Sequence, residues 1–181
     1  MSRIAKLAAV GASAAAVVAM TATSASAWTG GSVTGTLTAP LTVKVLGSNV
    51  ASCTTSTLNG SVTTADKLTI STAAISGCTG SGTVTVAAEA LPWANGTLTT
   101  GGGTASFNGF RVKANATLLG FPVTCIYAGT ITGTNTAASG SPLSTTVTFT
   151  NASVSKQSGS SGACPGTAQV SAQYKFQGAG L

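Results

Sequence analysis

A long alternation of apolar and hydroxyl side chains is the feature that most constrains the fold of this chain. From residue 33 to residue 45, an apolar side chain or a glycine stands at every odd position, and threonine or lysine stands at most even ones. Successive side chains of a β-strand point to opposite faces, so this period of two predicts a strand with one buried face. Residues 110–118 and 170–177 repeat the pattern, and no stretch after residue 27 has the 3.6-residue stripe of an amphipathic helix. The sequence therefore predicts an all-β protein.

Serine and threonine take the surface positions that charged residues usually occupy. Charged residues make up 6% of the chain, whereas hydrophobic residues make up 43%. Disordered chains show the opposite combination, low hydrophobicity with high charge. The composition therefore predicts a folded domain with a neutral, hydroxyl-rich exterior.

The N-terminal segment has the pattern of a secretory signal peptide. Arg3 and Lys6 precede an apolar run of 14 residues, and Ala25-Ser26-Ala27 matches the small-residue pattern that signal peptidase cleaves. The apolar run is shorter than the roughly 20 residues that span a bilayer. We therefore expect cleavage after Ala27 and a single β domain over residues 28–181, without a transmembrane helix. Its expected location is the medium or the cell envelope.

The two halves of the expected mature chain resemble each other. The stretch LGSNVASC (46–53) has a counterpart in LGFPVTC (119–125), and a valine follows six positions after both Cys78 and Cys164. An ordered series of matches of this kind predicts an internal duplication. We assign its halves to residues 33–93 and 105–181.

The four cysteines predict two disulfide bonds. Cys53, Cys78, Cys125 and Cys164 all lie in the part expected to be exported, and an even count in an oxidising compartment indicates pairing. Their equivalent positions in the two halves favour bridges within each half, Cys53–Cys78 and Cys125–Cys164. Four cysteines nevertheless permit three connectivities, and sequence alone leaves the choice open.

The alternating runs predict about eight strands, and eight to ten strands suit either an antiparallel sandwich or a small closed barrel. Three Asn-Gly pairs, at residues 59–60, 95–96 and 108–109, are expected to form tight hairpin turns. The expected strands are residues 33–46, 50–63, 67–76, 82–91, 105–119, 122–133, 143–155 and 168–177.

The inventory of reactive side chains is small. The sequence contains no histidine, which is the usual general base and the commonest metal ligand, and its two carboxylates are Asp66 and Glu89. Asp66 lies in an expected turn and Glu89 on the outward phase of an expected strand, so both are interpreted as surface groups. We expect no enzymatic activity, no metal site and no cofactor. The basic residues are scattered, which argues against nucleic-acid binding.

Two positions are candidates for contact with a ligand. Trp93 follows Leu91-Pro92 at the end of an expected strand, where an aromatic ring either covers the core or serves as a platform for a sugar. Lys156 begins the polar loop 156–163, a second possible contact point. We therefore expect a non-enzymatic, disulfide-stabilised exported protein that acts through surface contacts with a cell-wall glycan or another secreted protein.

Two alternative functions stay open at this point. The first is a ligand-binding module that binds glycans or resembles a protease inhibitor. The second is an envelope-associated β-barrel, because strands of membrane barrels also alternate, with apolar residues facing lipid.

Several stretches give the chain a family resemblance. The Ala-rich N-terminal segment, GTLTAPLTVKV (35–45), LPW (91–93) and the CPGTA stretch near the C-terminus resemble small secreted Ala/Thr/Gly-rich β proteins of actinobacteria. The resemblance implies export and a β fold. It supplies no activity and no site residues.

Overall fold

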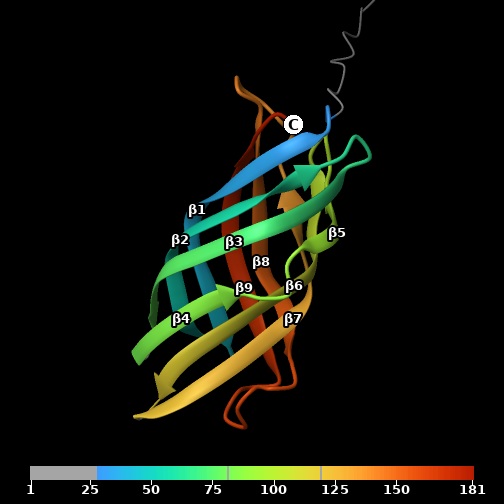
Figure 1. The fold of residues 1–181 in the computed structure, drawn as a ribbon. Helices are drawn as coiled ribbons and strands as arrows, with labels where there is room; N and C mark the ends of the chain where they lie inside the picture. The colour runs from blue at the N-terminus through green and yellow to red at the C-terminus, as the bar shows by residue number, and fades with distance from the viewer. Residues whose placement is uncertain (1–27, 81, 119) are drawn as a thin grey trace, which may run out of the picture.

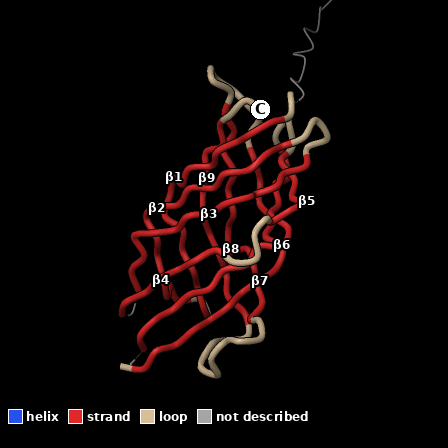
Figure 2. The backbone as a smooth tube through the Cα atoms, in the orientation of Figure 1, coloured by secondary structure: helices blue, strands red, loops and turns tan. Residues whose placement is uncertain are grey.

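The alternating runs form long antiparallel strands. The computed structural model of the chain describes residues 28–80, 82–118 and 120–181, and the regular structure of this part is entirely β (Figures 1 and 2). The predicted signal segment 1–27 lies outside the described residues. Within the described residues no helix is long and apolar enough to cross a membrane. The nine strands of this part are β1 (Gly31–Val45), β2 (Ser48–Val62), β3 (Lys67–Gly80), β4 (Gly82–Ala88), β5 (Trp93–Leu98), β6 (Gly103–Leu118), β7 (Phe121–Asn135), β8 (Ser144–Lys156) and β9 (Thr167–Gln177).

The sheet closes into an eight-stranded barrel with one extra strand. Strands that follow one another in sequence pair with one another, except β4 and β5, and β1 pairs with β9 to close the ring. The two short strands β4 and β5 share one place in the strand order, because each of them pairs with β3 on one side and with β6 on the other. Thus β4 pairs with the second part of β6 through Val84 and Ala116, whereas β5 pairs with its first part through Leu98 and Ala105. Of the two predicted architectures, the closed barrel is confirmed.

The eight predicted strands agree with observed strands to within a few residues, but the prediction that the three Asn-Gly pairs form hairpin turns is wrong. All three pairs lie inside strands, at shifts of register. Asn59-Gly60 coincides with a shift between β2 and β3, and Asn108-Gly109 lies inside the shift between Phe107 and Phe110 of β6. Asn95 (φ 60°) lies opposite a shift in β3. Asparagine and glycine tolerate the unusual backbone angles that both a β-bulge and a tight turn require. An Asn-Gly pair is therefore compatible with either feature.

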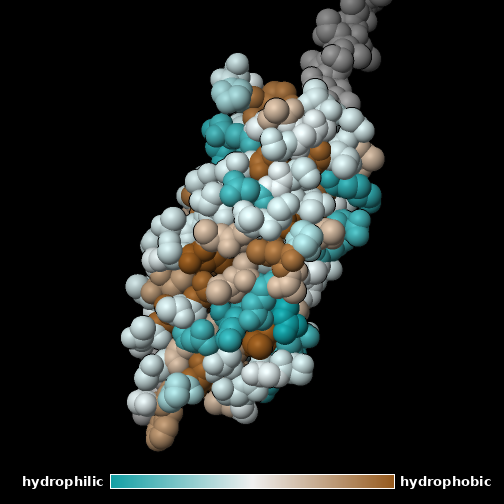
Figure 3. Space-filling model, in the orientation of Figure 1, coloured by the Kyte–Doolittle hydropathy of each residue, from teal (hydrophilic) through white to brown (hydrophobic). Residues whose placement is uncertain are grey.

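The apolar side chains of the alternating pattern face the barrel interior, and the hydroxyl side chains between them face outward. Along β9, for example, Val170 and Phe176 are 3% and 0% exposed, while Lys175 between the inward positions is exposed. Much of the face drawn in Figure 3 is pale, as expected for threonine, serine and glycine, and a group of hydrophobic residues across its middle lies next to a group of hydrophilic ones. This orientation is the reverse of a membrane barrel, whose apolar side chains face lipid.

The two ends of the barrel differ, and we call them the open end and the closed end. At the open end lie the turns β1–β2, β3–β4 and β6–β7 and the β8–β9 loop (157–166), in the lower part of Figure 1. At the closed end lie the turns β2–β3 and β5–β6, the β7–β8 loop and both ends of the described chain. The backbone amide of Gly30 donates to the carbonyl of Gly180 over 3.3 Å, which holds the two chain ends side by side. The buried indole of Trp28 donates to the carbonyl of Leu98 and covers this end.

Aromatic side chains fill the barrel toward the closed end. The ring of Phe107 lies 4.7 Å from the ring of Phe149 and 6.2 Å from that of Phe176, measured between centroids. The hydroxyl of Tyr174 donates to the hydroxyl of Ser56 over 3.0 Å inside the same core. An eight-stranded barrel has an interior that large side chains can fill completely.

Both disulfide bonds join the pairs that the sequence favours. Cys53 on β2 and Cys78 on β3 are directly opposite in the register and form one bridge. Cys125 on β7 is bonded to Cys164 in the β8–β9 loop, with 5.6 Å between their Cα atoms. The pairing within each half is therefore confirmed, whereas the internal duplication itself stays a prediction.

Candidate functional site: an apolar cavity at the open end

The open half of the barrel interior is hollow. It contains a cavity of about 290 Å³, which we call the barrel cavity. In the packed half, a space between the aromatic side chains has a volume of about 10 Å³, close to that of a single water molecule. Seven strands and the β8–β9 loop contribute to the wall of the barrel cavity. Its lining residues are Val43, Val45, Val50, Ala51, Val84, Val86, Val112, Ala114, Ala116, Val123, Cys125, Tyr127, Val154, Ala163, Pro165, Ala168 and Val170.

The cavity exists because the inward side chains are small at this end. On β9 the inward side chains are small at Ala168, Val170 and Ala172 and become large at Tyr174 and Phe176, toward the closed end. On β6 they change from Phe107 near the closed end to alanine near the open end. Eight strands enclose a nearly constant cross-section, so valine and alanine leave a space that aromatic side chains would fill.

The wall of the barrel cavity is neutral. None of the described residues that line it carries a formal charge, and its polar side-chain groups are the hydroxyl of Tyr127 and the disulfide sulfur of Cys125. The Tyr127 hydroxyl donates to the carbonyl of Pro165 over 3.1 Å. Burial raises the pKa of Tyr127 above its ordinary value of 10.0, so this group is neutral near pH 7. Transfer of a charged group into such a space is unfavourable, whereas transfer of apolar surface is favourable.

The barrel cavity opens to solvent at its rim. Val50 is 37% exposed and Ala163 is also exposed, although both line the cavity. Deeper lining residues such as Val170 are buried. A molecule could therefore enter along the barrel axis from the open end.

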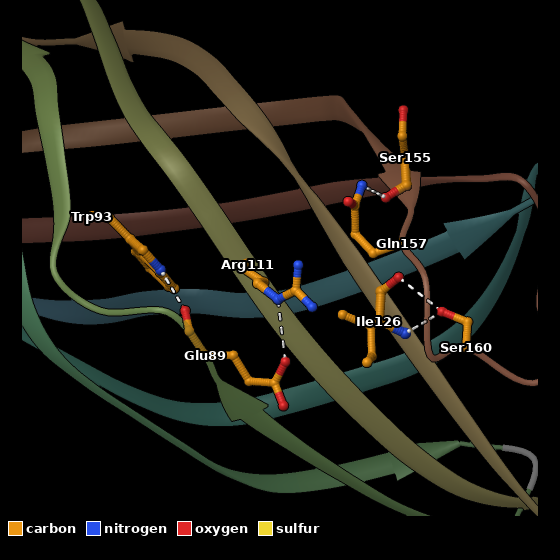
Figure 4. A network of polar contacts seen from close by, with 7 residues as sticks. All are labelled: Glu89, Trp93, Arg111, Ile126, Ser155, Gln157 and Ser160. Atoms are coloured by element: carbon orange, nitrogen blue, oxygen red, sulfur yellow. Dashed lines mark hydrogen bonds and ion pairs between the residues drawn. The ribbon is translucent and has the colours of Figure 1, made fainter.

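The rim is held in place by the β8–β9 loop. The hydroxyl of Ser160 accepts from the backbone amide of Ile126 over 2.9 Å and donates to its carbonyl over 3.1 Å (Figure 4). The amide of Ser161 donates to the carbonyl of Thr124 on the same strand, β7. The Cys125–Cys164 bridge ties the loop to β7 a second time. The loop thus continues the ladder beyond the end of β8 and forms a fixed part of the cavity wall.

Of the two residues predicted to contact a ligand, Lys156 lies at the rim of the barrel cavity and Trp93 is buried in the core. Lys156 ends β8, and its ammonium group donates to the carbonyl of Cys164 over 3.0 Å, so it supports the β8–β9 loop at the rim. Trp93 is 2% exposed and does not reach the surface. Its indole donates to the carbonyl of Glu89 over 3.0 Å, as Figure 4 shows, and its ring lies 4.9 Å from that of Phe110. Of the two interpretations of Trp93, the aromatic that covers the core describes its position, and the surface platform for a sugar does not.

The carboxylates lie on different parts of the barrel. Glu89 follows β4 in the middle of the wall and forms an ion pair with Arg111, with 3.3 Å between Oε2 and Nε (Figure 4). Asp66 lies in the β2–β3 turn at the closed end, where it accepts a hydrogen bond from Thr100. Among the described residues, no group of three or more histidine, cysteine, aspartate or glutamate side chains could hold a metal ion. Neither carboxylate lines the barrel cavity.

Comparison with known proteins adds no assignment. No protein family model, no curated protein and no solved structure matches this chain. The argument for function therefore depends on the geometry of the barrel. The barrel cavity was not among the sequence predictions, although the sequence contains a signal for it, since the inward residues of the last strand are small in its first part and aromatic at its end.

Proposed function

We propose that this protein is a non-enzymatic exported protein that binds one small, neutral, apolar molecule in the barrel cavity. The observation that carries the proposal is the uncharged cavity of about 290 Å³ at the open end. Ligand sites are common in the mouths of β-barrels and span roughly 300–1,000 Å³, so a volume at the lower limit favours a small ligand. This function deepens the ligand-binding alternative considered from the sequence and replaces glycan with an apolar molecule.

Export is supported by two independent features. The first 27 residues have the pattern of a cleavable signal peptide. The two disulfide bonds are typical of oxidising, extracellular compartments. A small hollow barrel gains particular benefit from such bridges, because it has fewer core contacts than a filled one.

A neutral aromatic probe tests the proposal directly. N-phenyl-1-naphthylamine becomes fluorescent in apolar surroundings, and 8-anilinonaphthalene-1-sulfonate has the same rings with an added sulfonate. With about 17 non-hydrogen atoms at about 0.4 kcal/mol each, the neutral probe should bind with about 7 kcal/mol, a Kd of about 10 μM. The sulfonate should bind at least about tenfold more weakly, because the cavity offers no cation to pair with it.

A matched pair of variants locates the binding site. Ala114 lines the barrel cavity, and a phenylalanine there should occupy part of it. Thr85 lies on the neighbouring strand, opposite Asn115 in the register, and its side chain is exposed on the outer face. We expect Ala114→Phe to weaken binding of the neutral probe at least about tenfold and Thr85→Phe to leave it unchanged. Wild-type affinity for the neutral probe in a folded Ala114→Phe variant, or an equal loss of affinity in Thr85→Phe, would show that the cavity is not the site.

A further inference from the structure

The most exposed large apolar side chains surround the entrance to the barrel cavity. Among the described residues, large apolar side chains with more than a third of their surface exposed are Leu46 (96%), Phe121 (72%) and Val50 (37%). Leu46 lies in the β1–β2 turn, Val50 is the third residue of β2, and Phe121 begins β7 at the β6–β7 turn. Both turns lie at the open end, on different sides of the barrel (Figure 1). Apolar groups therefore project from the same end at which the cavity opens.

The backbone at Leu46 disfavours the residue that stands there. Val45 and Ser48 are register partners, so Leu46-Gly47 is a two-residue turn, with φ of 49° and 82°. Turns with two positive φ values favour Asn-Gly, and leucine is rare at such a φ. With 96% of its surface exposed, the side chain also gains almost nothing from packing. Neither local conformation nor burial accounts for a leucine here, which points to a contact outside the chain.

The charge near the open end is positive. Lys44 lies next to the β1–β2 turn, Lys113 lies on the outer face of the open half of β6, and Lys156 ends β8 at the rim. Of the two acidic residues in the sequence, Glu89 is paired with Arg111, and Asp66 lies at the closed end. The three lysines of the open half therefore have no acidic residue near the rim to balance them.

We infer that the open end docks on a lipid bilayer surface that carries anionic headgroups. Leu46, Val50 and Phe121 would lie in the interfacial region of the bilayer, and the lysines would face its phosphates. Association with a membrane surface is favoured by apolar side chains that insert into it and by basic residues that attract its anionic headgroups, and the open end has residues of both kinds. If the cavity binds an apolar molecule as proposed above, docking places its entrance where that molecule can pass to the bilayer without crossing water.

Sedimentation with vesicles tests the docking itself. The probes are vesicles of phosphatidylcholine alone and vesicles of phosphatidylcholine with phosphatidylglycerol. We expect the purified protein to bind the anionic vesicles at least tenfold more tightly than the neutral ones. Absence of binding, or equal binding to both kinds of vesicle, would overturn the inference.

Two sets of variants distinguish this end of the barrel from the rest. The double variant Leu46→Asn, Phe121→Thr should lower vesicle binding at least tenfold, and Leu46→Asn suits the backbone, so loss of folding is not expected. The charge-matched pair is Lys44→Gln, Lys113→Gln at the open end and Lys67→Gln, Lys175→Gln nearer the closed end. The first should weaken binding to anionic vesicles, and the second should not. Equal effects of the two lysine pairs would mean attraction without a docking surface and would overturn the inference.

Two further measurements separate this inference from its alternatives. Leu46 and Phe121 do not line the barrel cavity, so their double variant should bind N-phenyl-1-naphthylamine as the wild type does. Docking and ligand binding can therefore fail independently of each other. Sedimentation velocity without vesicles tests a second copy of the chain as the occupant. A concentration-dependent dimer that the double variant abolishes would assign these apolar residues to self-association and overturn membrane docking.

Discussion

Replacement of Leu46 by asparagine should stabilise the protein, which is an unusual expectation for the loss of a large apolar side chain. Because the side chain is 96% exposed, its removal forfeits almost no buried surface, and the backbone decides the outcome. A left-handed conformation costs a residue such as leucine about 1–2 kcal/mol, and asparagine tolerates it far better. The observed φ of 49° lies in this region. We expect the free energy of unfolding to rise by about 1 kcal/mol, which corresponds to a Tm higher by about 4 °C for a domain of about 150 residues.

Thermal unfolding followed by circular dichroism measures this effect, and Leu46→Ala is the control. Alanine also removes the leucine side chain but has the same aversion to a positive φ, so its Tm should match that of the wild type. If Leu46→Asn melts at or below the wild-type temperature, the leucine contributes to folding. The reasoning that assigns this residue to an external contact would then be refuted.

Two other properties of the barrel can be tested in the same way. Burial, partly opposed by the hydrogen bond to Ser56, raises the pKa of Tyr174 to about 12, so the tyrosine stays neutral in the folded state while the unfolded chain ionises from about pH 10. This group should therefore leave the free energy of unfolding unchanged below pH 10 and lower it by about 3 kcal/mol as the pH rises from 10 through 12. Urea unfolding at several pH values should show a steeper fall for the wild type than for Tyr174→Phe. Parallel pH dependences of the two proteins would contradict this expectation. Loss of the Cys125–Cys164 bridge, which closes a span of 39 residues, should cost about 4 kcal/mol and release the β8–β9 loop. Differential scanning calorimetry of Cys125→Ala, Cys164→Ala should give a lower Tm, and an unchanged Tm would mean that the hydrogen bonds of Ser160 and Ser161 alone hold the loop.

Much of this fold follows from local patterns in the sequence. The alternation at residues 33–45 predicts β1 because each side chain reports which face of the strand is buried. The equivalent positions of Cys53 and Cys125 predict the disulfide pairing, since both follow the first turn of their half. Strand β5 was missed because a bulge at Asn95 breaks the alternation. The Asn-Gly pairs were misplaced for a related reason, as bulges and turns select the same residues.

The barrel cavity could not be predicted from the alternation alone. A period of two shows that Ala114 and Val170 face inward, but not how much space remains between them. That space depends on which inward residues of the several strands lie at the same level along the barrel axis. The register between the strands determines those levels. The exposure of Leu46 also came from the structure, because the alternation places this residue at the end of the expected strand 33–46, whereas the register places it in the β1–β2 turn. The candidate site thus needed the assembled structure, although its individual residues are visible in the chain.

The barrel interior is packed with aromatic side chains in one half and hollow in the other, and this division affects how the protein can change during evolution. Truncation of a packed aromatic such as Phe107 or Phe149 would leave a void and cost about 3–5 kcal/mol, a large share of the stability of a small domain. An exchange between valine and alanine at the open end instead alters a space that already exists, at much lower cost. Substitutions there can change which molecule fits while the aromatic half keeps the barrel folded. The same strands therefore combine a tightly packed scaffold with a lining that tolerates change. If the cavity binds an apolar molecule as proposed, its ligand preference can change in steps that each preserve a folded protein.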